Sequence, residues 1–263
     1  MNPSSNQQSS PIQGRVGVLG ATGFVGRNLC HQLQVDHQYH RPNIDQLAHE
    51  SLDWLIVSAM PAVKWWANQH EEEDLENLHK LKASLRNAKT HKLILISTVD
   101  VFPDPYLVTE ATDIELSRCH PYGKHRLLLE HFVQDYFDAL IIRLPGLFGE
   151  GLKKNIIYDY LNDNQTEKID TRHQFQFYDL DNVGQDLHYF AQQPWPVINL
   201  ATAPISALEV QTLCTGSRQE QVTVEQPIRY DFKTQFTDSG YFYTQQDVTG
   251  QLQRFVARNQ VVV

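Results

Sequence analysis

Tyr122 is the residue in this sequence whose neighbours best suit acid–base chemistry. It lies in the stretch HPYGKHRLLLE, residues 120–130, with two basic residues, Lys124 and Arg126, close behind it. A cation near a tyrosine hydroxyl favours the phenolate and lowers the tyrosine pKa from its usual value of about 10. The same pattern also fits an ordinary helix start with a charged face. Which of these two hypotheses holds, and which cation is the partner of Tyr122, depends on the elements around this stretch.

A glycine-rich segment near the N-terminus is the second candidate for chemistry. In VLGATGFVG, Gly20, Gly23 and Gly26 are spaced G-x-x-G-x-x-G between an apolar run and a stretch with helical spacing. Glycines there permit a tight turn and close approach of a pyrophosphate to the backbone, at the positive end of a helix. A glycine-rich turn without a ligand is the alternative. The strand before it and the helix after it favour nucleotide binding.

Apolar runs and amphipathic stretches alternate through the first half of the chain. This pattern predicts strands at 15–20, 52–59, 91–98 and 138–149, and helices at 24–34, 71–89 and 122–137. Residues 36–50 hold a short, polar, weak strand. Strands that alternate with helices indicate an α/β protein with a doubly wound parallel sheet.

The chain divides into three parts by pattern. Residues 1–13 read as a polar, disordered tail, and residues 14–149 carry the alternating strands and helices. In residues 150–263 the pattern loosens into a helix, a strand and loop leading into another helix, a further strand, then turns, short strands and a terminal helix. We expect this last part to pack on the first as a small C-terminal lobe, interleaved with the last strands of the sheet.

Composition excludes several classes of protein. The 263 residues carry a formal charge of −9 and no strongly basic stretch, which argues against nucleic-acid binding. Three widely spaced cysteines suggest neither a disulfide framework nor a zinc ribbon and fit a reducing, cytoplasmic location. The twelve histidines show no metal-binding spacing, no run is apolar enough to span a membrane, and the polar start is no signal peptide.

Three motifs in order resemble the extended short-chain dehydrogenase/reductase family. The family commonly reads T-G-x-x-G-x-x-G, S-[ST]-x-x-V-[YF] and Y-G-x-x-K-x-x-x-E, and here the corresponding segments are ATGFVGRNL, STVDVF and YGKHRLLLE. The resemblance covers residues 14–149 and continues more faintly through FYDLDNVGQDL and VINLATAPIS. It implies a Rossmann-like fold whose C-terminal lobe binds substrate. Because the chain is short for this family, we expect that lobe to be reduced.

The resemblance assigns catalytic roles by position. Thr98 matches the residue that hydrogen-bonds the substrate oxygen, and Tyr122 matches the general acid/base. The family's lysine, four residues after the tyrosine, is replaced here by Arg126. Since residues four apart share a helix face, Arg126 is the expected partner and Lys124 is a solvated surface charge. An arginine supplies positive charge and hydrogen bonds to the nicotinamide ribose, but it does not readily give up its proton.

The resemblance also implies a nicotinamide cofactor, NAD or NADP. The expected contacts are Gly20, Thr22, Gly23, Phe24, Val25, Gly26, Arg41 and Ala59. No acidic residue stands clearly where the ribose 2′-hydroxyl would be held, and Arg41 lies nearer that place. An arginine there can hold the 2′-phosphate of NADP, so Arg41 favours NADP, unless it is an ordinary surface arginine.

The resemblance implies NAD(P)-dependent reduction or epimerisation of a sugar nucleotide, a small-molecule substrate. STVDVF is similar to the STDYVF pattern of the dTDP-4-dehydrorhamnose reductases. Lys153 and Lys154 can meet a nucleotide diphosphate or simply begin a solvated helix, whereas Arg143, Asp179 and Asp181 read as structural. The alternative is a non-catalytic NAD(P)-binding sensor or complex subunit, which Arg126 favours. A homodimer through 71–89 and 122–137 is also expected from the family.

Overall fold

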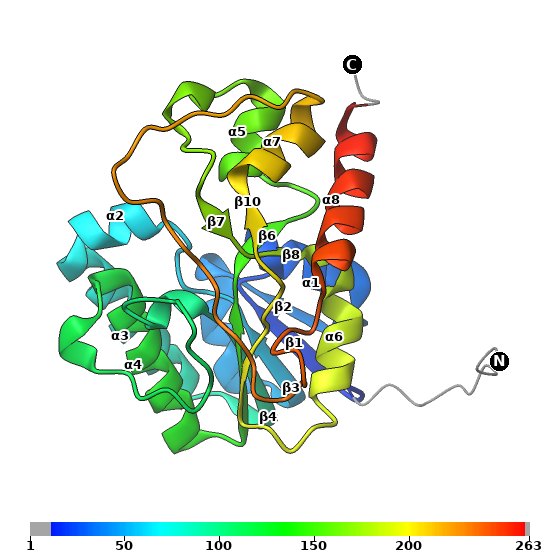
Figure 1. The fold of residues 1–263 in the computed structure, drawn as a ribbon. Helices are drawn as coiled ribbons and strands as arrows, with labels where there is room; N and C mark the ends of the chain where they lie inside the picture. The colour runs from blue at the N-terminus through cyan, green and yellow to red at the C-terminus, as the bar shows by residue number, and fades with distance from the viewer. Residues whose placement is uncertain (1–11, 261–263) are drawn as a thin grey trace.

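A parallel sheet forms the centre of the computed structural model, which describes residues 12–260 (Figure 1). Within these residues six strands lie side by side in the order β2-β1-β3-β4-β5-β9, and every neighbouring pair is parallel. Both outer strands, β2 and β9, have only three residues. The strands are β1 Val16–Leu19, β2 His37–Tyr39, β3 Ser51–Val57, β4 Lys89–Thr98, β5 Ala139–Leu144 and β9 Val197–Asn199.

Helices cover both faces of this sheet because its strands are apolar on both sides. Along β4, Leu93 and Leu95 face one core and Ile94 faces the other. One face packs against α3 (Glu71–Arg86) and α4 (Pro121–Tyr136), and the other against α1 (Phe24–Gln32) and α6 (Val183–Phe190). This two-sided arrangement confirms the doubly wound α/β fold expected from the sequence.

The chain reverses direction across the sheet between β1 and β3. From β1 it runs through α1 to β2 on one side, then through the 3₁₀ segment η1 (Arg41–His49) to β3 on the other side of β1. In open α/β sheets, ligands bind at the carboxyl ends of the strands beside such a switch point. The weak strand expected within 36–50 is therefore the real strand β2, reduced to three residues.

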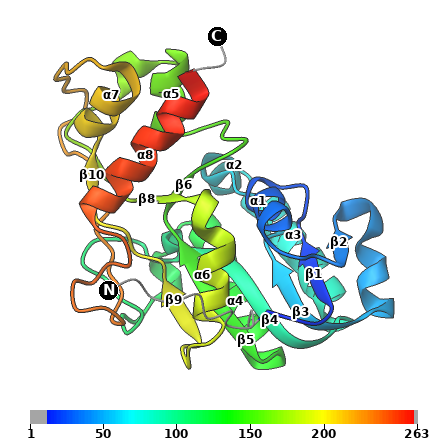
Figure 2. The same cartoon turned by 90° about the vertical axis from the view of Figure 1, so that its right-hand side faces the viewer.

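The C-terminal part forms a smaller lobe beyond the carboxyl ends of the strands, most clearly separated in Figure 2. Its apolar core is distinct from the two cores of the central sheet. The lobe holds two small sheets, one pairing β6 with β8 and the other β7 with β10. Its elements are β6 Gly146–Phe148, α5 Ile156–Asn162, β7 Gln174–Phe175, β8 Phe177–Asp179, β10 Ile205–Ser206, α7 Ala207–Thr215 and α8 Gln245–Gln260.

Two helices were missed by the sequence reading. Helix α2, Lys64–Gln69, follows β3 and has one buried residue, Ala67, so it carries no apolar periodicity. Helix α7 begins with a capping box in which the Ser206 side chain and the Glu209 side chain each bond the other's backbone N–H. The S-x-x-E spacing was a usable signal for α7, whereas α2 offered none. Short 3₁₀ turns connect other elements, at Val99–Val101 (η2), Leu116–Arg118 (η3), Thr166–Lys168 (η4) and Leu180–Asn182 (η5).

Most of the expected tail, residues 1–11, lies outside the described residues. Ile12, which the sequence placed in that tail, is buried, with 6% of its surface exposed, in the core between the sheet and α1 and α6. The part of the chain that the structure describes contains no helix long and apolar enough to cross a membrane.

The stability of the fold depends on pH through Asp179, whose carboxyl group is buried at the end of β8. Burial raises the pKa of Asp179 to about 6, while in an unfolded chain it is about 3.9. Between these values the folded protein keeps a proton that the unfolded chain has lost. Stability therefore falls as the pH rises from about 4 to 6, and the penalty persists above pH 6.

We expect Asp179→Asn to raise the free energy of unfolding at pH 7.5 by on the order of 1–3 kcal/mol, and to change it little at pH 4. The amide oxygen of asparagine can still accept the bond from the Asp181 backbone N–H, which is 3.0 Å long. Urea unfolding at both pH values measures this. Asp163→Asn, at an exposed carboxyl, is the control. An equal gain at both pH values would contradict the titration argument.

Candidate functional site

The glycine loop lies at the switch point, between the carboxyl ends of β1 and β3. Gly20 has φ +93°, and a Cβ there would lie 2.6 Å from the Ser58 carbonyl oxygen, so only glycine fits. A Cβ on Gly26 would lie 2.1 Å from the Gly20 carbonyl oxygen, so its absence lets α1 pack onto the end of β1. Ala59, the expected contact after β3, lies directly beside Gly20.

The N-terminus of α1 is free to receive an anion. Gly23 is the N-cap residue, and no side chain bonds the first N–H groups. The first turn of α1 contains no acidic residue. Thr22 and Gly23 are exposed, while Phe24 and Val25 pack against the core and anchor the turn. Unsatisfied N–H groups and the positive end of the helix dipole make this a suitable place for a diphosphate.

Arg41 lies where the chain leaves β2, at the start of η1. The residue is exposed, and its guanidinium reaches the Asn77 side-chain oxygen only at 3.5 Å. Arg41 is thus close to the carboxyl end of β2. This is the place, near the ribose of the dinucleotide, where the sequence led us to expect it.

Tyr122 and Thr98 are brought together at the carboxyl end of β4. Thr98 is the last residue of β4, and Tyr122 is in the first turn of α4, and the two side chains lie close enough for Thr98 to influence the Tyr122 hydroxyl. Gly123 permits this approach, because a Cβ there would lie 2.0 Å from the Asp100 carbonyl oxygen. The backbone N–H of Tyr122 donates to the Asn68 side chain of α2 at 3.0 Å. Motifs 24 residues apart in the sequence therefore form one polar pair.

The Tyr122 hydroxyl is held in its neutral form. Burial raises the pKa of Tyr122, and the nearby Asp100 raises it further. Arg126, the hydrogen bond from Thr98, and Lys64 each act to lower that pKa, but burial outweighs them. Arg126 therefore lowers the pKa of Tyr122, as the sequence predicted, but the net pKa of Tyr122 is still raised. A neutral phenol donates a proton at pH 7 more readily than it accepts one.

Arg126 lies over the face of the Tyr122 ring, with its guanidinium carbon 3.9 Å from the ring centroid. Its side chain is 5% exposed and forms an ion pair with Asp74 of α3, which is fully buried. The two terminal nitrogens of Arg126 bond both Asp74 oxygens, the Pro61 carbonyl and the Tyr122 carbonyl. The donors expected to reach a ribose are therefore engaged with the protein. Lys124 instead pairs with Glu71 at 3.2 Å near the surface, as the spacing predicted.

A second polar cluster, which the sequence reading missed, adjoins the Thr98–Tyr122 pair. The Lys64 ammonium donates to the Asp100 carboxylate at 2.7 Å and to the Tyr230 hydroxyl at 3.1 Å. Tyr230 also donates to Asp100, at 2.8 Å. The cluster thus joins α2, the turn after β4 and the C-terminal lobe. Asp100 lies within the STVDVF motif and could have been singled out, whereas Lys64 and Tyr230 carry no motif.

The segment after β6, residues 149–154, lies close to the glycine loop and to the end of β3. The Glu150 carbonyl accepts a hydrogen bond from Asn28 of α1 at 3.1 Å. Lys154 donates to the Ala62 carbonyl in the connection between β3 and α2. Lys153 is exposed. Of the two lysines considered for a nucleotide diphosphate, Lys154 therefore has a protein partner in the structure.

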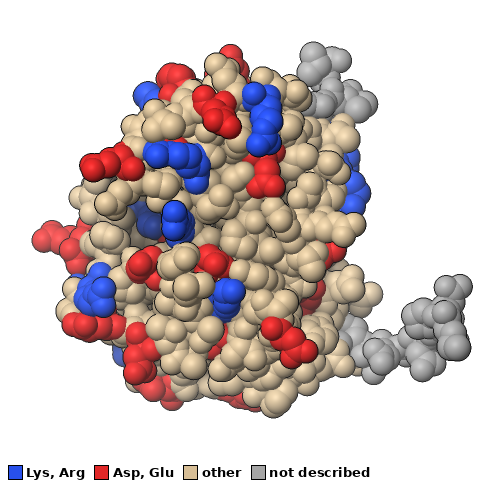
Figure 3. All heavy atoms as spheres, viewed as in Figure 1, with Lys and Arg blue, Asp and Glu red and all other residues tan. Residues whose placement is uncertain are grey.

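The surface over this region is hollowed. Figure 3, in the view of Figure 1, shows a hollow beside the position of α2, with lysine and arginine side chains around it.

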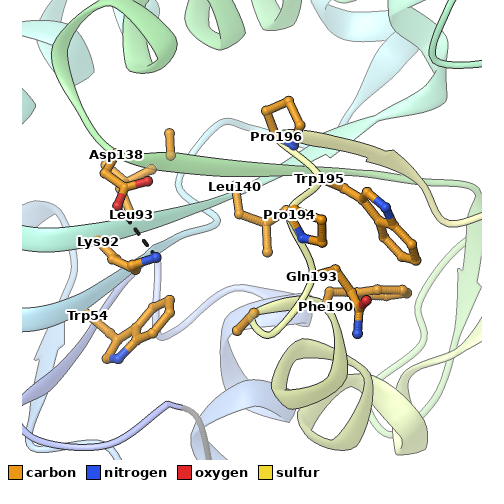
Figure 4. A pocket seen from close by; sticks show the side chains of 12 residues that line it. Trp54, Lys92, Leu93, Asp138, Leu140, Phe190, Gln193, Pro194, Trp195 and Pro196 are labelled. Carbon is orange, nitrogen blue, oxygen red and sulfur yellow. Dashed lines mark ion pairs between the residues drawn. The ribbon is translucent and has the colours of Figure 1, made fainter.

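A separate pocket of about 220 Å³ lies at the opposite end of the sheet (Figure 4). Trp54 and Trp195 line it with Pro194 and Pro196, and the ion pair between Lys92 and Asp138 closes one side. These residues lie near the amino ends of the strands, away from Thr98 and the glycine loop. Among the described residues, no group of three or more histidine, cysteine, aspartate or glutamate side chains is arranged to hold a metal ion.

Solved structures provide the comparison that identifies the fold. No protein-family model matches the chain, and no curated protein matches its sequence. The UDP-glucose 4-epimerase of Thermotoga maritima, solved with UDP-glucose, superposes with a TM-score of 0.72 at 14% identity, covering 94% of this chain and 100% of that one. The dTDP-4-dehydrorhamnose reductase of Bacillus anthracis, solved with NADP, gives 0.70 at 16% identity, covering 97% and 100%.

An epimerase of Methanothermobacter thermautotrophicus gives a TM-score of 0.71 at 15% identity and covers 95% of this chain and 94% of that one. The chain has the fold of these epimerases and reductases. The resemblance drawn from three motifs is thereby confirmed at the level of the fold, over nearly the whole chain rather than residues 14–149 alone. The epimerase-like fold includes the C-terminal lobe, whose sequence pattern was the weakest.

Proposed function

We propose that this protein is an NAD(P)-dependent oxidoreductase or epimerase that acts on a sugar nucleotide. The observation that carries the proposal is the proximity of Thr98 and Tyr122 at the same edge of the sheet as the glycine loop. The loop supplies a place for a dinucleotide, and the pair supplies a proton donor beside it. The structural neighbours include enzymes solved with UDP-glucose, with NAD and with NADP, which supports this substrate class and this cofactor.

The residues at the switch point fit a dinucleotide. Gly20 and Gly26 bring the backbone close together, and the uncapped N-terminus of α1 offers N–H groups to the diphosphate. Arg41, exposed at the start of η1, is proposed to contact the 2′-phosphate of NADP, and Ala59 lies beside Gly20. When bound, the nicotinamide supplies or accepts the hydride at the reacting carbon of the sugar.

In the reducing direction, Thr98 donates a hydrogen bond to the ketone oxygen and holds the substrate. Tyr122 gives its proton to that oxygen as the hydride reaches the carbon, so the ketone becomes a hydroxyl. The raised pKa of Tyr122 keeps this proton available at neutral pH. Oxidation of a hydroxyl, the first half of an epimerisation, needs the phenolate instead. A neutral Tyr122 is therefore suited to the protonation step of a reduction, which is also the second half of an epimerisation.

The rival proposal is a non-catalytic NAD(P)-binding sensor or complex subunit. It is favoured by Arg126, which replaces the family's lysine and whose terminal nitrogens bond Asp74 and backbone carbonyls. A screen of UDP- and dTDP-sugars, followed by the absorbance of reduced nicotinamide, separates the two proposals. Cofactor binding without turnover of any sugar would favour the sensor.

We expect NADPH to bind more tightly than NADH, and Arg41→Ala to remove that preference. Loss of a charge-assisted bond to the 2′-phosphate should weaken NADPH binding roughly tenfold or more and leave NADH binding unchanged. Titrations followed by nucleotide fluorescence measure both affinities. Arg254→Ala, an exposed arginine on α8, is the control. If neither nucleotide binds below the millimolar range, the cofactor proposal fails, and the roles of Thr98 and Tyr122 fail with it.

The proposed assembly is a homodimer that pairs through α3 and α4, as the family resemblance implies. Tyr136, at the end of α4, is 58% exposed and offers apolar surface to such a contact. Sedimentation of the purified protein tests this, because a monomer at micromolar concentration would contradict it.

A further inference from the structure

The bridge formed by Lys64, Asp100 and Tyr230 has two polar groups without a protein partner. The Lys64 ammonium and the Tyr230 hydroxyl both donate to Oδ1 of Asp100, at 2.7 Å and 2.8 Å. No donor within residues 12–260 bonds the second oxygen of that carboxylate, Oδ2. Lys64 also donates to the Tyr230 hydroxyl at 3.1 Å, which uses two of its three N–H donors. The bridge therefore offers one free acceptor and one free donor, on two groups that are bonded to each other.

This bridge lies beside the residue proposed to hold the substrate oxygen. The backbone N–H of Asp100 donates to the Thr98 hydroxyl oxygen at 3.1 Å. Thr98 therefore keeps its own O–H for a substrate, and the Asp100 carboxylate lies in the same turn. The side chains of Asp100 and Lys64 are 19% and 44% exposed, so a ligand can reach both. Figure 3 shows a hollow beside α2, the helix that begins at Lys64.

Both lobes hold the bridge in position. On the side of the sheet, Gly123 of α4 packs against the Asp100 carbonyl. In the C-terminal lobe, the backbone N–H of Tyr230 donates to the Gln174 carbonyl of β7 at 3.0 Å. The Tyr230 ring also stacks on Phe175, with the ring centroids 6.2 Å apart. The free acceptor and donor are thus held in place before a ligand binds, which lowers the cost of ordering them.

A carboxylate oxygen beside an ammonium N–H suits a hydroxyl group. A hydroxyl donates one hydrogen bond and accepts others, so a single hydroxyl can donate to Asp100 and accept from Lys64. A methylene group in its place would leave both charged groups without a partner. A phosphate or a carboxylate would be repelled by the negative charge of Asp100. A ring hydroxyl of the sugar is therefore the substrate group that matches the pair.

We propose that Asp100 and Lys64 bind the sugar hydroxyl on the ring carbon next to the one whose oxygen Thr98 holds. The inference rests on the proposed function and narrows its substrate class to nucleotide sugars with a free hydroxyl at that place. Sugars that lack this hydroxyl are selected against, because they leave the carboxylate and the ammonium unpaired. Tyr230 is a positioning residue that fixes the Asp100 carboxylate from the C-terminal lobe.

The test is a binding measurement with a matched series of ligands. Calorimetry on the full chain compares UDP-glucose with the UDP-deoxyglucoses that each lack one ring hydroxyl. Loss of the hydroxyl bound by the pair should weaken binding roughly 10- to 100-fold, because hydrogen bonds to charged groups are strong. This penalty should shrink severalfold in Asp100→Ala and in Lys64→Met, and it should disappear in the double variant. Thr98→Val should in the same way reduce the penalty for the neighbouring hydroxyl on the ring.

Asp104→Ala is the matched control, since it removes the same charge from an exposed aspartate just after this turn. It should leave every penalty unchanged. A bridge that merely joins the two lobes predicts a different result, in which Asp100→Ala weakens the binding of all the ligands equally. That result, or a set of penalties that neither variant reduces, overturns the inference. Circular dichroism checks folding, and Lys64→Met carries the test if Asp100→Ala does not fold.

The outcomes separate this inference from the proposed function. If UDP-glucose and its analogues bind but the hydroxyl penalties do not depend on Asp100 or Lys64, the proposed function stands and the inference fails. A protein that binds neither UDP-glucose nor any analogue overturns the inference together with the sugar-nucleotide proposal.

Discussion

Replacing Tyr122 by phenylalanine should abolish most turnover while leaving cofactor affinity unchanged. The substitution removes the proton donor beside Thr98 and keeps the ring that packs under Arg126. Loss of a positioned general acid lowers the rate of the chemical step roughly 10²- to 10⁴-fold. Steady-state turnover of the best sugar nucleotide measures the loss, and fluorescence titration with the preferred nicotinamide nucleotide measures the affinity.

Tyr136→Phe is the control for this substitution, because Tyr136 lies on the same helix α4 but is exposed. It should retain full turnover. If Tyr122→Phe also kept full turnover, Tyr122 would have no role as an acid, and the sensor proposal would be favoured. A parallel loss of cofactor affinity would instead indicate damage to the site as a whole.

Breaking the buried ion pair between Asp74 and Arg126 should cost much of the protein's stability. Both side chains are 5% exposed or less, and Asp74 also bonds the buried His125 at 2.7 Å. Asp74→Ala leaves the guanidinium buried without its partner, a change that typically costs about 3–5 kcal/mol. Urea unfolding gives this free energy directly.

The double variant Asp74→Ala with Arg126→Met should be less destabilised than the sum of the two single variants, because neither buried charge is then left unpaired. Glu71→Gln is the matched control. It breaks the half-exposed pair of Glu71 with Lys124, which joins the same two helices, and should change stability by less than about 1 kcal/mol. Equal losses in Asp74→Ala and Glu71→Gln would show that burial of the pair is unimportant.

The features that the sequence predicted well depend only on residues close together in the sequence. The apolar runs of β1, β3, β4 and β5 and the glycine spacing need only neighbouring residues to be recognised. Thr98 and Tyr122 were predicted as site residues because each belongs to a short motif, and their roles stay a prediction; the structure shows only that the two side chains lie near each other. The distance between the motifs in the chain did not matter, since parallel strands bring their carboxyl ends to one edge.

What the sequence did not disclose depends on contacts between distant elements. The spacing placed Arg126 on the face of Tyr122, but only the fold shows that Asp74 of α3 engages its charge. Lys64 lies in a short helix with no periodicity, and Tyr230 lies in the C-terminal lobe. These pairings leave no pattern in the neighbouring sequence, because they depend on how α2 and the C-terminal lobe pack against the sheet.

The outer strands of the central sheet bear on how this protein avoids aggregation. An exposed sheet edge offers unpaired N–H and C=O groups to which a strand of another molecule can add. Here β2 and β9 have three residues each, so each edge offers few such groups. Edge-to-edge addition of one copy to another would gain little, and the sheet is protected from fibril-like growth. The proposed homodimer, which pairs through α3 and α4, would use helical surfaces and leave these sheet edges unpaired.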